Sequence, residues 1–311
     1  MWLLARLASA FVVLIVVSAI IFALTRLAPV SPARIVLGVE ATPEQISRFE
    51  AERGLDRPVI VQFGHWLADL PTEGFAKSYI TGQSINELVA GSLPITLEIV
   101  TLAFFVAVTG SILLGSLSAI FESTWIDHAV RIASVAALSI PGFWLAFLLM
   151  RLFAVQLGWF PPIGVAGWSK GAWAHFSSLV LPALSISIYY VGAMSRLLRA
   201  SFIEVLDADY MRTARALGLS GRTRFIYALR NALPPFVSMA AMSFGYMFGW
   251  AVVVETVFSI PGLSRALLTA IFQRDYPAIQ ACVIVITCAF VASNTLADIL
   301  QRMLNPKLAA T

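Results

Sequence analysis

The residues that most often carry out chemistry in proteins are few and scattered in this chain. The three histidines, His65, His128 and His175, are far apart in the sequence, and no H-E-x-x-H zinc motif occurs. Cys282 and Cys288 fall on different faces of one apolar helix, which argues against a disulfide or a metal pair. No lysine follows a glycine, so the phosphate-binding motif G-x-x-x-x-G-K-[ST] is absent. We expect no metal site, no cofactor and no ATP site in this chain.

One compact polar segment, DADYMRTARALGLSGRTRF, begins at Asp207 between two long apolar stretches. Asp207 or Asp209 can cap the start of a helix, and Gly218 is typical of the position just after a helix end. A narrow apolar stripe lies between them at helical spacing, formed by Leu206, Tyr210, Ala214 and Leu217. These residues alone leave two interpretations open: a solvated basic loop that is helical, or a short helix that docks into a groove of a soluble partner.

Three of the charged residues inside apolar stretches lie at similar depth by the rise of a helix: Glu98, Arg151 and Glu255. A charge within the bilayer is costly and usually faces the interior of a helix bundle. We therefore hypothesise that Arg151 pairs with Glu98 or Glu255. Such a pair either packs helices together or contacts a substrate, and the sequence does not decide between the two.

A pathway through the bundle would use aromatic and small side chains of the second to fifth stretches. The candidates are Phe143, Trp144, Tyr246, Met247, Trp250 and Glu255. The segment from Ser259 to Leu263 interrupts the helical pattern and is predicted to form an outer gate or a short re-entrant turn.

The composition indicates what kind of element carries these residues. Hydrophobic residues make up 59% of the chain and charged residues 12%, about half the share of a soluble domain. We predict an all-α polytopic membrane protein and no nucleic-acid binding. A spanning helix needs about 20 apolar residues, and six stretches qualify: 7–27, 93–121, 130–157, 179–200, 234–258 and 277–300.

A polar segment separates the first two stretches, which suggests a division into residues 1–28, 29–92, 93–300 and 301–311. Within the 29–92 segment, Thr42 and Gln45 form a capping-box pattern before a helix that should end at Gly54. A second helix is predicted from the helical spacing of four apolar residues, Val59, Phe63, Trp66 and Leu70.

The basic residues predict the orientation, because short cytoplasmic loops are rich in Lys and Arg. The connection between the fourth and fifth stretches contains seven arginines: Arg196, Arg199, Arg212, Arg215, Arg222, Arg224 and Arg230. We therefore place loop 201–232 and both termini in the cytoplasm, and segment 29–92 outside.

Several ordered motifs resemble one family over nearly the whole chain. DYMRTARALGL…ALRNALPP is similar to the cytoplasmic loop of permease subunits of binding-protein-dependent ABC importers, in their peptide/nickel branch. GLDRPVIVQFGHWL, LPITLEI, SIPGFWLAFLL, LGWFPPIG, LPALSIS and VVVETVFSIPGLSRALLTAIFQRDYPAIQ follow the same branch. The general pattern is Glu-Ala-Ala, three residues, then Gly. Here Arg212, Thr213 and Ala214 precede Gly218, and this departure is shared by the branch.

The resemblance implies a type I ABC importer permease fold in a bacterial inner membrane, with no catalysis by this chain. It implies a coupling helix that contacts an ATPase, formed by Asp209, Tyr210, Arg212, Thr213, Ala214, Arg215, Leu217 and Gly218. The implied partners are a homologous second permease, two ATPases that bind ATP and Mg, and an external solute-binding protein. Di- or oligopeptides are the implied cargo, with nickel or a metal chelate as the alternative. A secondary transporter without an ATPase is the alternative of another class.

Overall fold

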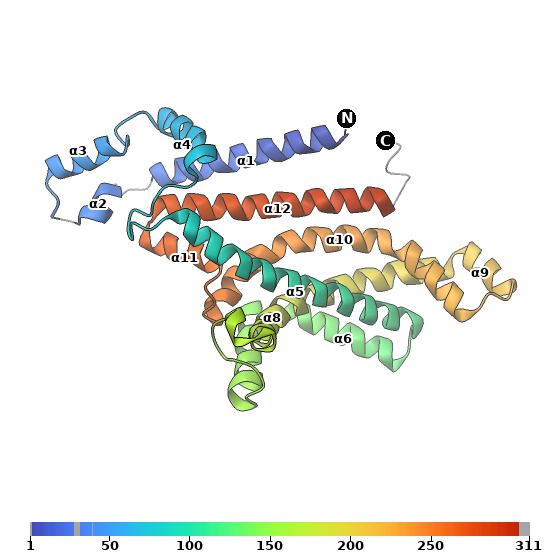
Figure 1. Cartoon of the computed structure of the whole chain (residues 1–311). Helices are drawn as coiled ribbons and strands as arrows, with labels where there is room; N and C mark the ends of the chain where they lie inside the picture. The colour runs from blue at the N-terminus through green and yellow to red at the C-terminus, as the bar shows by residue number, and fades with distance from the viewer. Residues whose placement is uncertain (1, 28–31, 39, 305–311) are drawn as a thin grey trace. The chain divides into compact units, whose positions relative to one another are not determined.

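A computed structural model describes residues 2–27, 32–38 and 40–304. These residues are almost entirely helical, and the only extended pairing among them is an isolated β-bridge between Lys77 and Ser84. The predicted all-α class is confirmed. Figure 1 traces the helices from the blue N-terminal end to the red C-terminal end.

Most of the predicted spans are single helices. Within the described part of the chain, five helices are long and apolar enough to cross a membrane: Ala5–Arg26, Ile85–Ile120, Ala172–Asp207, Gly221–Val257 and Tyr276–Leu296. Several are longer than the 20 or so residues that a bilayer requires. The arginine-rich run after Gly221 is continuous with the fifth span, because Pro234 and Pro235 are accommodated within α10 (Gly221–Val257).

The third predicted span is not one straight helix. Helix α6 (Trp125–Ser139) ends before Pro141, and α7 (Gly142–Leu149) with the π-helix η1 (Met150–Gln156) continues at an angle of 107° to it. A proline disfavours helical geometry in the residue before it, and Ile140 is extended with φ −79° and ψ 125°. The predicted span over 130–157 is thus a bent pair of helices, which counts as a sixth span if the pair crosses the membrane as one broken helix.

The chain divides into two compact units, the first formed by Met1–Thr96 and Pro261–Val291. Its helices are α1 (Trp2–Arg26), α2 (Pro32–Leu37), α3 (Pro43–Glu52), α4 (Val59–Glu73), the start of α5 (Ile85–Ile120), α11 (Leu263–Gln273) and the start of α12 (Tyr276–Leu304). Its core is a cluster around Ile85, Tyr276 and Ala281. The Gln280 amide, in α12, donates to the Thr25 hydroxyl, in α1, at 2.9 Å.

The polar segment between α1 and α5 folds as its local signals predict. The Thr42 hydroxyl accepts from the Gln45 amide N–H, and the Gln45 side chain accepts from the Thr42 N–H, so the capping box is confirmed. Gly54 follows α3 with φ +63°. In α4 the ring of Phe63 packs edge-on against Phe22 of α1, with 5.4 Å between ring centroids.

Two polar contacts hold chain segments of the first unit together that are distant in the sequence. The Ser78 hydroxyl donates to the buried Asp275 carboxylate at 2.5 Å, and the Tyr79 amide donates to the same group at 3.2 Å. The Thr96 hydroxyl accepts from the Leu263 amide at 2.8 Å, where α11 begins. Helix α11 was not anticipated, since we expected only a gate or a re-entrant turn in this connection.

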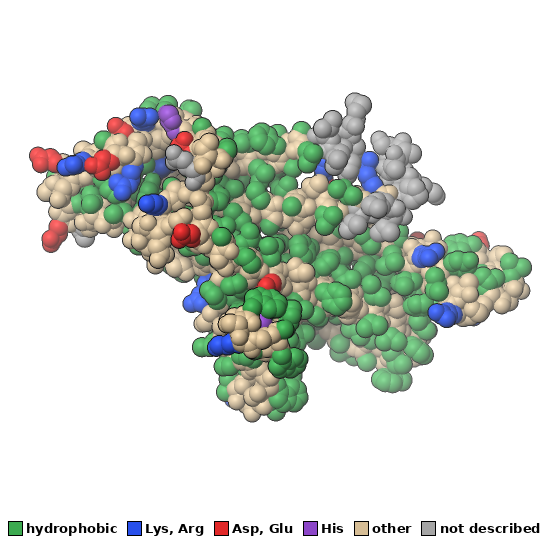
Figure 2. Space-filling model, viewed as in Figure 1, with side chains coloured by type: hydrophobic (Ala, Val, Ile, Leu, Met, Phe, Trp, Pro, Cys, Tyr) green, Lys and Arg blue, Asp and Glu red, His purple; other side chains and the backbone are tan. Residues whose placement is uncertain are grey.

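The second unit comprises Leu97–Ile260 and Ala292–Thr311. Beyond α5, α6, α7 and η1 it contains the 3₁₀-helix η2 (Trp168–Lys170), α8 (Ala172–Asp207), α9 (Asp209–Ala216) and α10. Helix α8 is the most buried of the spans. Figure 2 shows apolar side chains over the long helices, whereas charged ones gather over α2–α4 in the first unit.

Small residues set the packing around α8. A β-carbon at Gly115 of α5 would lie 2.8 Å from the Ser195 carbonyl oxygen, and one at Gly192 would lie 2.8 Å from the Ser134 carbonyl oxygen. The hydroxyls of Ser134 and Ser195 are 3.1 Å apart. Such close backbone approach through small residues is typical of helix packing in membranes.

Candidate functional site

Helix α9 forms the corner between α8 and α10 and presents two different faces. Met211 and Ala214 are buried against their own subunit, whereas Tyr210 is 50% exposed and Leu217 is 74% exposed. The predicted stripe of Leu206, Tyr210, Ala214 and Leu217 is therefore not one contact face. Met211 takes the inward position, and Tyr210 and Leu217 point outward.

The end of α9 is fixed by its backbone. The Leu219 amide donates to the Ala214 carbonyl at 3.1 Å and the Gly218 amide donates to the Arg215 carbonyl at 3.0 Å, the two bonds of a Schellman motif. Gly218 has φ +73°, a left-handed conformation that glycine adopts without steric cost. The predicted stop at Gly218 is confirmed.

The polar side chains of α9 contact mainly their own segment. Arg212 lies 3.4 Å from the Asp209 carboxylate, and the Thr213 hydroxyl donates to the Asp209 carbonyl. The Arg215 guanidinium donates to the Leu206 carbonyl at 2.5 Å, where α8 ends. The Arg215 bond thus ties α9 back to α8.

A buried ion pair joins α8 to the first turn of α6. Asp127 is 1% exposed and accepts two bonds of 2.7 Å from the Arg199 guanidinium. It also accepts from the Ser118 hydroxyl at 2.6 Å and from the Ser123 amide at 3.1 Å. Sequence reasoning missed this pair and used Arg199 only as a marker of orientation. The available signal was an acidic residue three positions after Thr124, a residue type that caps helix starts.

The predicted pathway residues separate into an exposed group and a buried group. Phe143, Trp144, Tyr246 and Trp250 are between 39% and 54% exposed. Met247 and Glu255 have no exposed surface, so neither side chain lies on the surface of the subunit in this structure.

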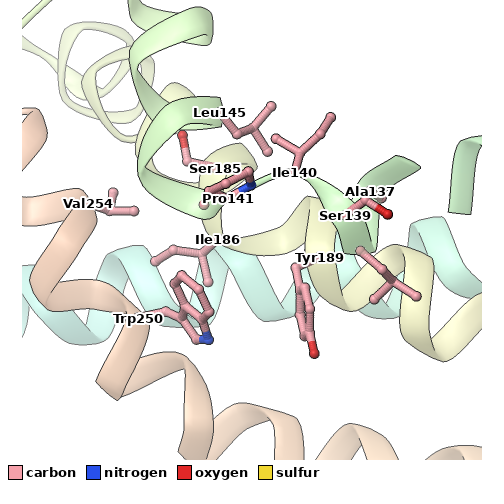
Figure 3. A pocket seen from close by; sticks show the side chains of 12 residues that line it. Ala137, Ser139, Ile140, Pro141, Leu145, Ser185, Ile186, Tyr189, Trp250 and Val254 are labelled. Carbon is pink, nitrogen blue, oxygen red and sulfur yellow. The ribbon is translucent and has the colours of Figure 1, made fainter. Parts of the chain in front are cut away.

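A small apolar cavity of about 170 Å³ lies at the break between α6 and α7. Figure 3 shows the rings of Tyr189 and Trp250 on one side of it and Ile140, Pro141 and Leu145 on the other. Trp250 approaches the start of α7 so closely that a β-carbon at Gly142 would lie 2.7 Å from its ring. The cavity is smaller than the ~300–1,000 Å³ of ligand pockets, so it does not enclose a peptide by itself.

The charged residues within the spans do not form the predicted pair. Glu98 is hydrogen-bonded to His175, with 2.8 Å between Oε2 and Nε2, and the other ring nitrogen of His175 lies 2.7 Å from the Ala166 carbonyl oxygen. Arg151 is exposed on η1 and has no ion pair in the described part of the chain. A carboxylate is satisfied equally well by a histidine, and the histidines had been considered only as metal ligands or catalytic groups.

The residues that commonly ligate metals are dispersed as well. Over the described ranges, no three His, Cys, Asp or Glu side chains lie close enough together to hold a metal ion. Cys282 is buried and Cys288 is exposed, and neither forms a disulfide.

Comparison with known proteins gives the family. Residues 111–310 match the family described as binding-protein-dependent transport system inner membrane component, and residues 1–100 match the N-terminal family of the same transport system. The chain belongs to this family of ABC importer permeases. The resemblance based on the α9 segment and the motifs around it is therefore confirmed, and the chain is a transport subunit and not an enzyme.

Relatives of this permease extend over its whole length. A putative peptide transport system permease protein of Brucella abortus (strain 2308) is 36% identical over 307 residues, covering 98% of each chain. The glutathione transport system permease protein of Salmonella typhimurium is 34% identical over 308 residues, covering 99% of this chain and 98% of the relative.

Solved structures share the fold of this permease. A methionine ABC transporter in inward-facing conformations has a TM-score of 0.59 at 15% identity and covers 71% of this chain and 98% of its own. An amino acid ABC transporter with histidines has a TM-score of 0.55 at 15% identity. The match covers 70% of this chain and 94% of the transporter chain. Both likenesses concern the helical architecture alone.

Proposed function

We propose that this permease forms one half of an import pathway for short peptides. Its partners are a homologous second permease, two ATPase subunits that bind ATP and Mg, and an external solute-binding protein. The relatives named as peptide and glutathione permeases support this cargo, because glutathione is itself a tripeptide. Nothing in the family or in the fold assigns nucleotide chemistry to this chain.

Helix α9 is the contact with an ATPase in this proposal. The observation that carries it is the division of its surface: Met211 and Ala214 anchor the helix to its own subunit, while Tyr210 and Leu217 leave an apolar tip exposed. A short helix with an exposed apolar tip fits a groove on a folded partner. Loop 201–232 and both termini then face the cytoplasm, and the segment between α1 and α5 faces outward.

The anchoring of α9 supplies a route for motion into the spans. A push on α9 reaches α8 directly through the bond from Arg215 to the Leu206 carbonyl. From α8 it reaches the start of α6 through the ion pair of Arg199 with Asp127. Helix α6 in turn leads to the break at Pro141, beside the cavity. ATP-driven closure of the ATPases would therefore change the geometry at the broken span.

The exposed aromatic side chains form the wall of the pathway in this proposal. Phe143 and Trp144 come from α7, and Tyr246 and Trp250 come from α10. Aromatic rings contact peptide side chains and backbone without requiring one sequence. A pathway built from them suits a cargo whose side chains vary, with a second permease closing the other side.

The ATPase contact is tested by co-purification of the ATPases with the full-length permease. Tyr210→Ala should weaken ATPase retention several-fold, because it removes apolar area at the centre of the proposed contact. Tyr227→Ala is the matched control, since Tyr227 is 46% exposed on the neighbouring helix α10. Gly218→Asp should act like Tyr210→Ala, since a β-carbon strains the left-handed turn that orients the tip. If all three variants retained the ATPases equally well, α9 would not be part of the ATPase contact.

The cargo is tested by uptake in cells that lack this permease and express each variant. Wild type should restore uptake of labelled dipeptides or glutathione, and Tyr210→Ala should lower the rate without lowering the amount of permease in the membrane. Restored uptake of Ni²⁺ alone, without any peptide, would refute the peptide assignment and leave the importer class intact.

A further inference from the structure

A groove of about 420 Å³ lies behind α9, in the second unit. Its walls come from the end of α5, the last turns of α8, from α9 itself and from the start of α10. The lining residues are Ile120, Phe202, Leu206, Met211, Arg215, Gly221, Arg224 and Phe225. Its size falls within the range of about 300–1,000 Å³ that is typical of ligand pockets.

The polar side of this groove is strongly cationic. Arg215 and Arg224 both line it, and its lining contains no carboxylate. The Nε of Arg224 is buried without a hydrogen-bond partner. A buried donor without a partner carries a desolvation cost, which is larger when the donor is charged. The groove therefore fits an anion with several acceptor oxygens.

The other side of the groove is apolar. Phe202 and Met211 are fully buried beneath it, and the rings of Phe202 and Phe225 pack with 5.7 Å between centroids. Ile120 lines it and remains 49% exposed. A small hydrophilic anion would leave this half of the groove without a contact, whereas an anion attached to a hydrocarbon chain would cover it.

The neighbourhood of the groove is that of a membrane surface. Ile120 is the last residue of the span α5, and Trp125, at the start of α6, is 78% exposed. Exposed tryptophans gather at the interface between lipid and water. Arginines beside this interface attract anionic lipid headgroups, and each arginine contributes a binding free energy of about 1 kcal/mol.

From these observations we propose that the groove behind α9 binds an anionic phospholipid. The phosphate lies between the guanidiniums of Arg215 and Arg224 and supplies the acceptor that Arg224 lacks, and an acyl chain covers Ile120 and Phe225. The lipid fills the space between α9 and the spans. The site lies on the inner side of α9, so it does not depend on how the outer side meets an ATPase.

The test measures lipid binding to the full-length permease by native mass spectrometry, with phosphatidylglycerol and phosphatidylcholine of equal chain length. Arg224→Gln should weaken phosphatidylglycerol binding about fivefold, the fold-change that corresponds to one interfacial arginine. Arg222→Gln is the matched control, because Arg222 is exposed on the same helix and does not line the groove. It removes the same charge and should leave binding unchanged.

Four results would overturn the proposal. The first is equal loss of phosphatidylglycerol in Arg224→Gln and Arg222→Gln, which would indicate attraction by overall charge. The second is equal binding of the two lipids by wild type. The third is displacement of the lipid by millimolar inorganic phosphate, which would identify a soluble anion as the occupant. The fourth is a loss of ATPase retention in Arg224→Gln with unchanged lipid binding, which would show that Arg224 contacts the ATPase and not a lipid.

Discussion

Replacing Arg199 with methionine isolates the buried ion pair, because methionine keeps much of the side-chain volume and removes the charge. The Asp127 carboxylate, 1% exposed as a residue, would lose two of its four hydrogen bonds and keep those from Ser118 and Ser123. Breaking one side of a buried pair costs about 3–5 kcal/mol. The Arg199 side chain is 22% exposed, so we expect a loss near the lower end, about 3 kcal/mol.

The assay is unfolding of the purified permease in mixed micelles by increasing SDS, with Arg196→Met as the control. Arg196 lies one turn earlier on α8, is exposed and forms no ion pair within the described residues, so its replacement should change the unfolding free energy by less than about 0.5 kcal/mol. The double variant Asp127→Asn, Arg199→Met removes the unpaired charge and should recover at least half of the loss. A loss below about 1 kcal/mol in Arg199→Met, or strict additivity in the double variant, would refute the reasoning.

Two further predictions concern packing and the polar anchor of the first unit. Gly115→Ala should lower the unfolding free energy by about 1–3 kcal/mol, because the new β-carbon would lie 2.8 Å from a backbone carbonyl. Gly249→Ala, with no atom within 4 Å of the new carbon, should be neutral or stabilising, and equal effects of the two glycine variants would contradict the packing described here. Ser78→Ala should cost about 1–3 kcal/mol, because buried Asp275 loses its 2.5 Å bond. Hydrogen exchange should then accelerate in the amides of 79–81, and unchanged exchange there would contradict the anchoring role.

Local signals predicted much of this molecule. Apolar length located five spans, the Thr42 capping box located the start of α3, and Gly218 located the end of α9. Each of these depends on a few neighbouring residues whose preferences act in the same direction. The break at Pro141 also had a local signal, but the strong hydropathy of the whole stretch concealed it.

Contacts between distant residues were not accessible in the same way. Glu98 had several conceivable partners, and only the fold places His175 beside it while Arg151 faces outward. The pairing of Asp127 with Arg199 joins residues 72 positions apart and required the close crossing of α8 that small residues permit. Helix α9 illustrates the same limit, because periodicity placed Ala214 and Leu217 on one stripe and only the packing shows that one is buried and the other exposed.

The bond between Ser78 and Asp275 has a consequence for biosynthesis. It joins residues 197 positions apart, and it belongs to a unit whose two stretches are separated by Leu97–Ile260 of the second unit. At about 5–20 residues per second, a ribosome needs about 10–40 s to make the chain between them. During that time the segment between α1 and α5 lacks this bond, whereas the helices around α8 can already assemble. The segment between α1 and α5 is thus fastened late in synthesis, and a chain truncated before α11 would lack the carboxylate that holds Ser78.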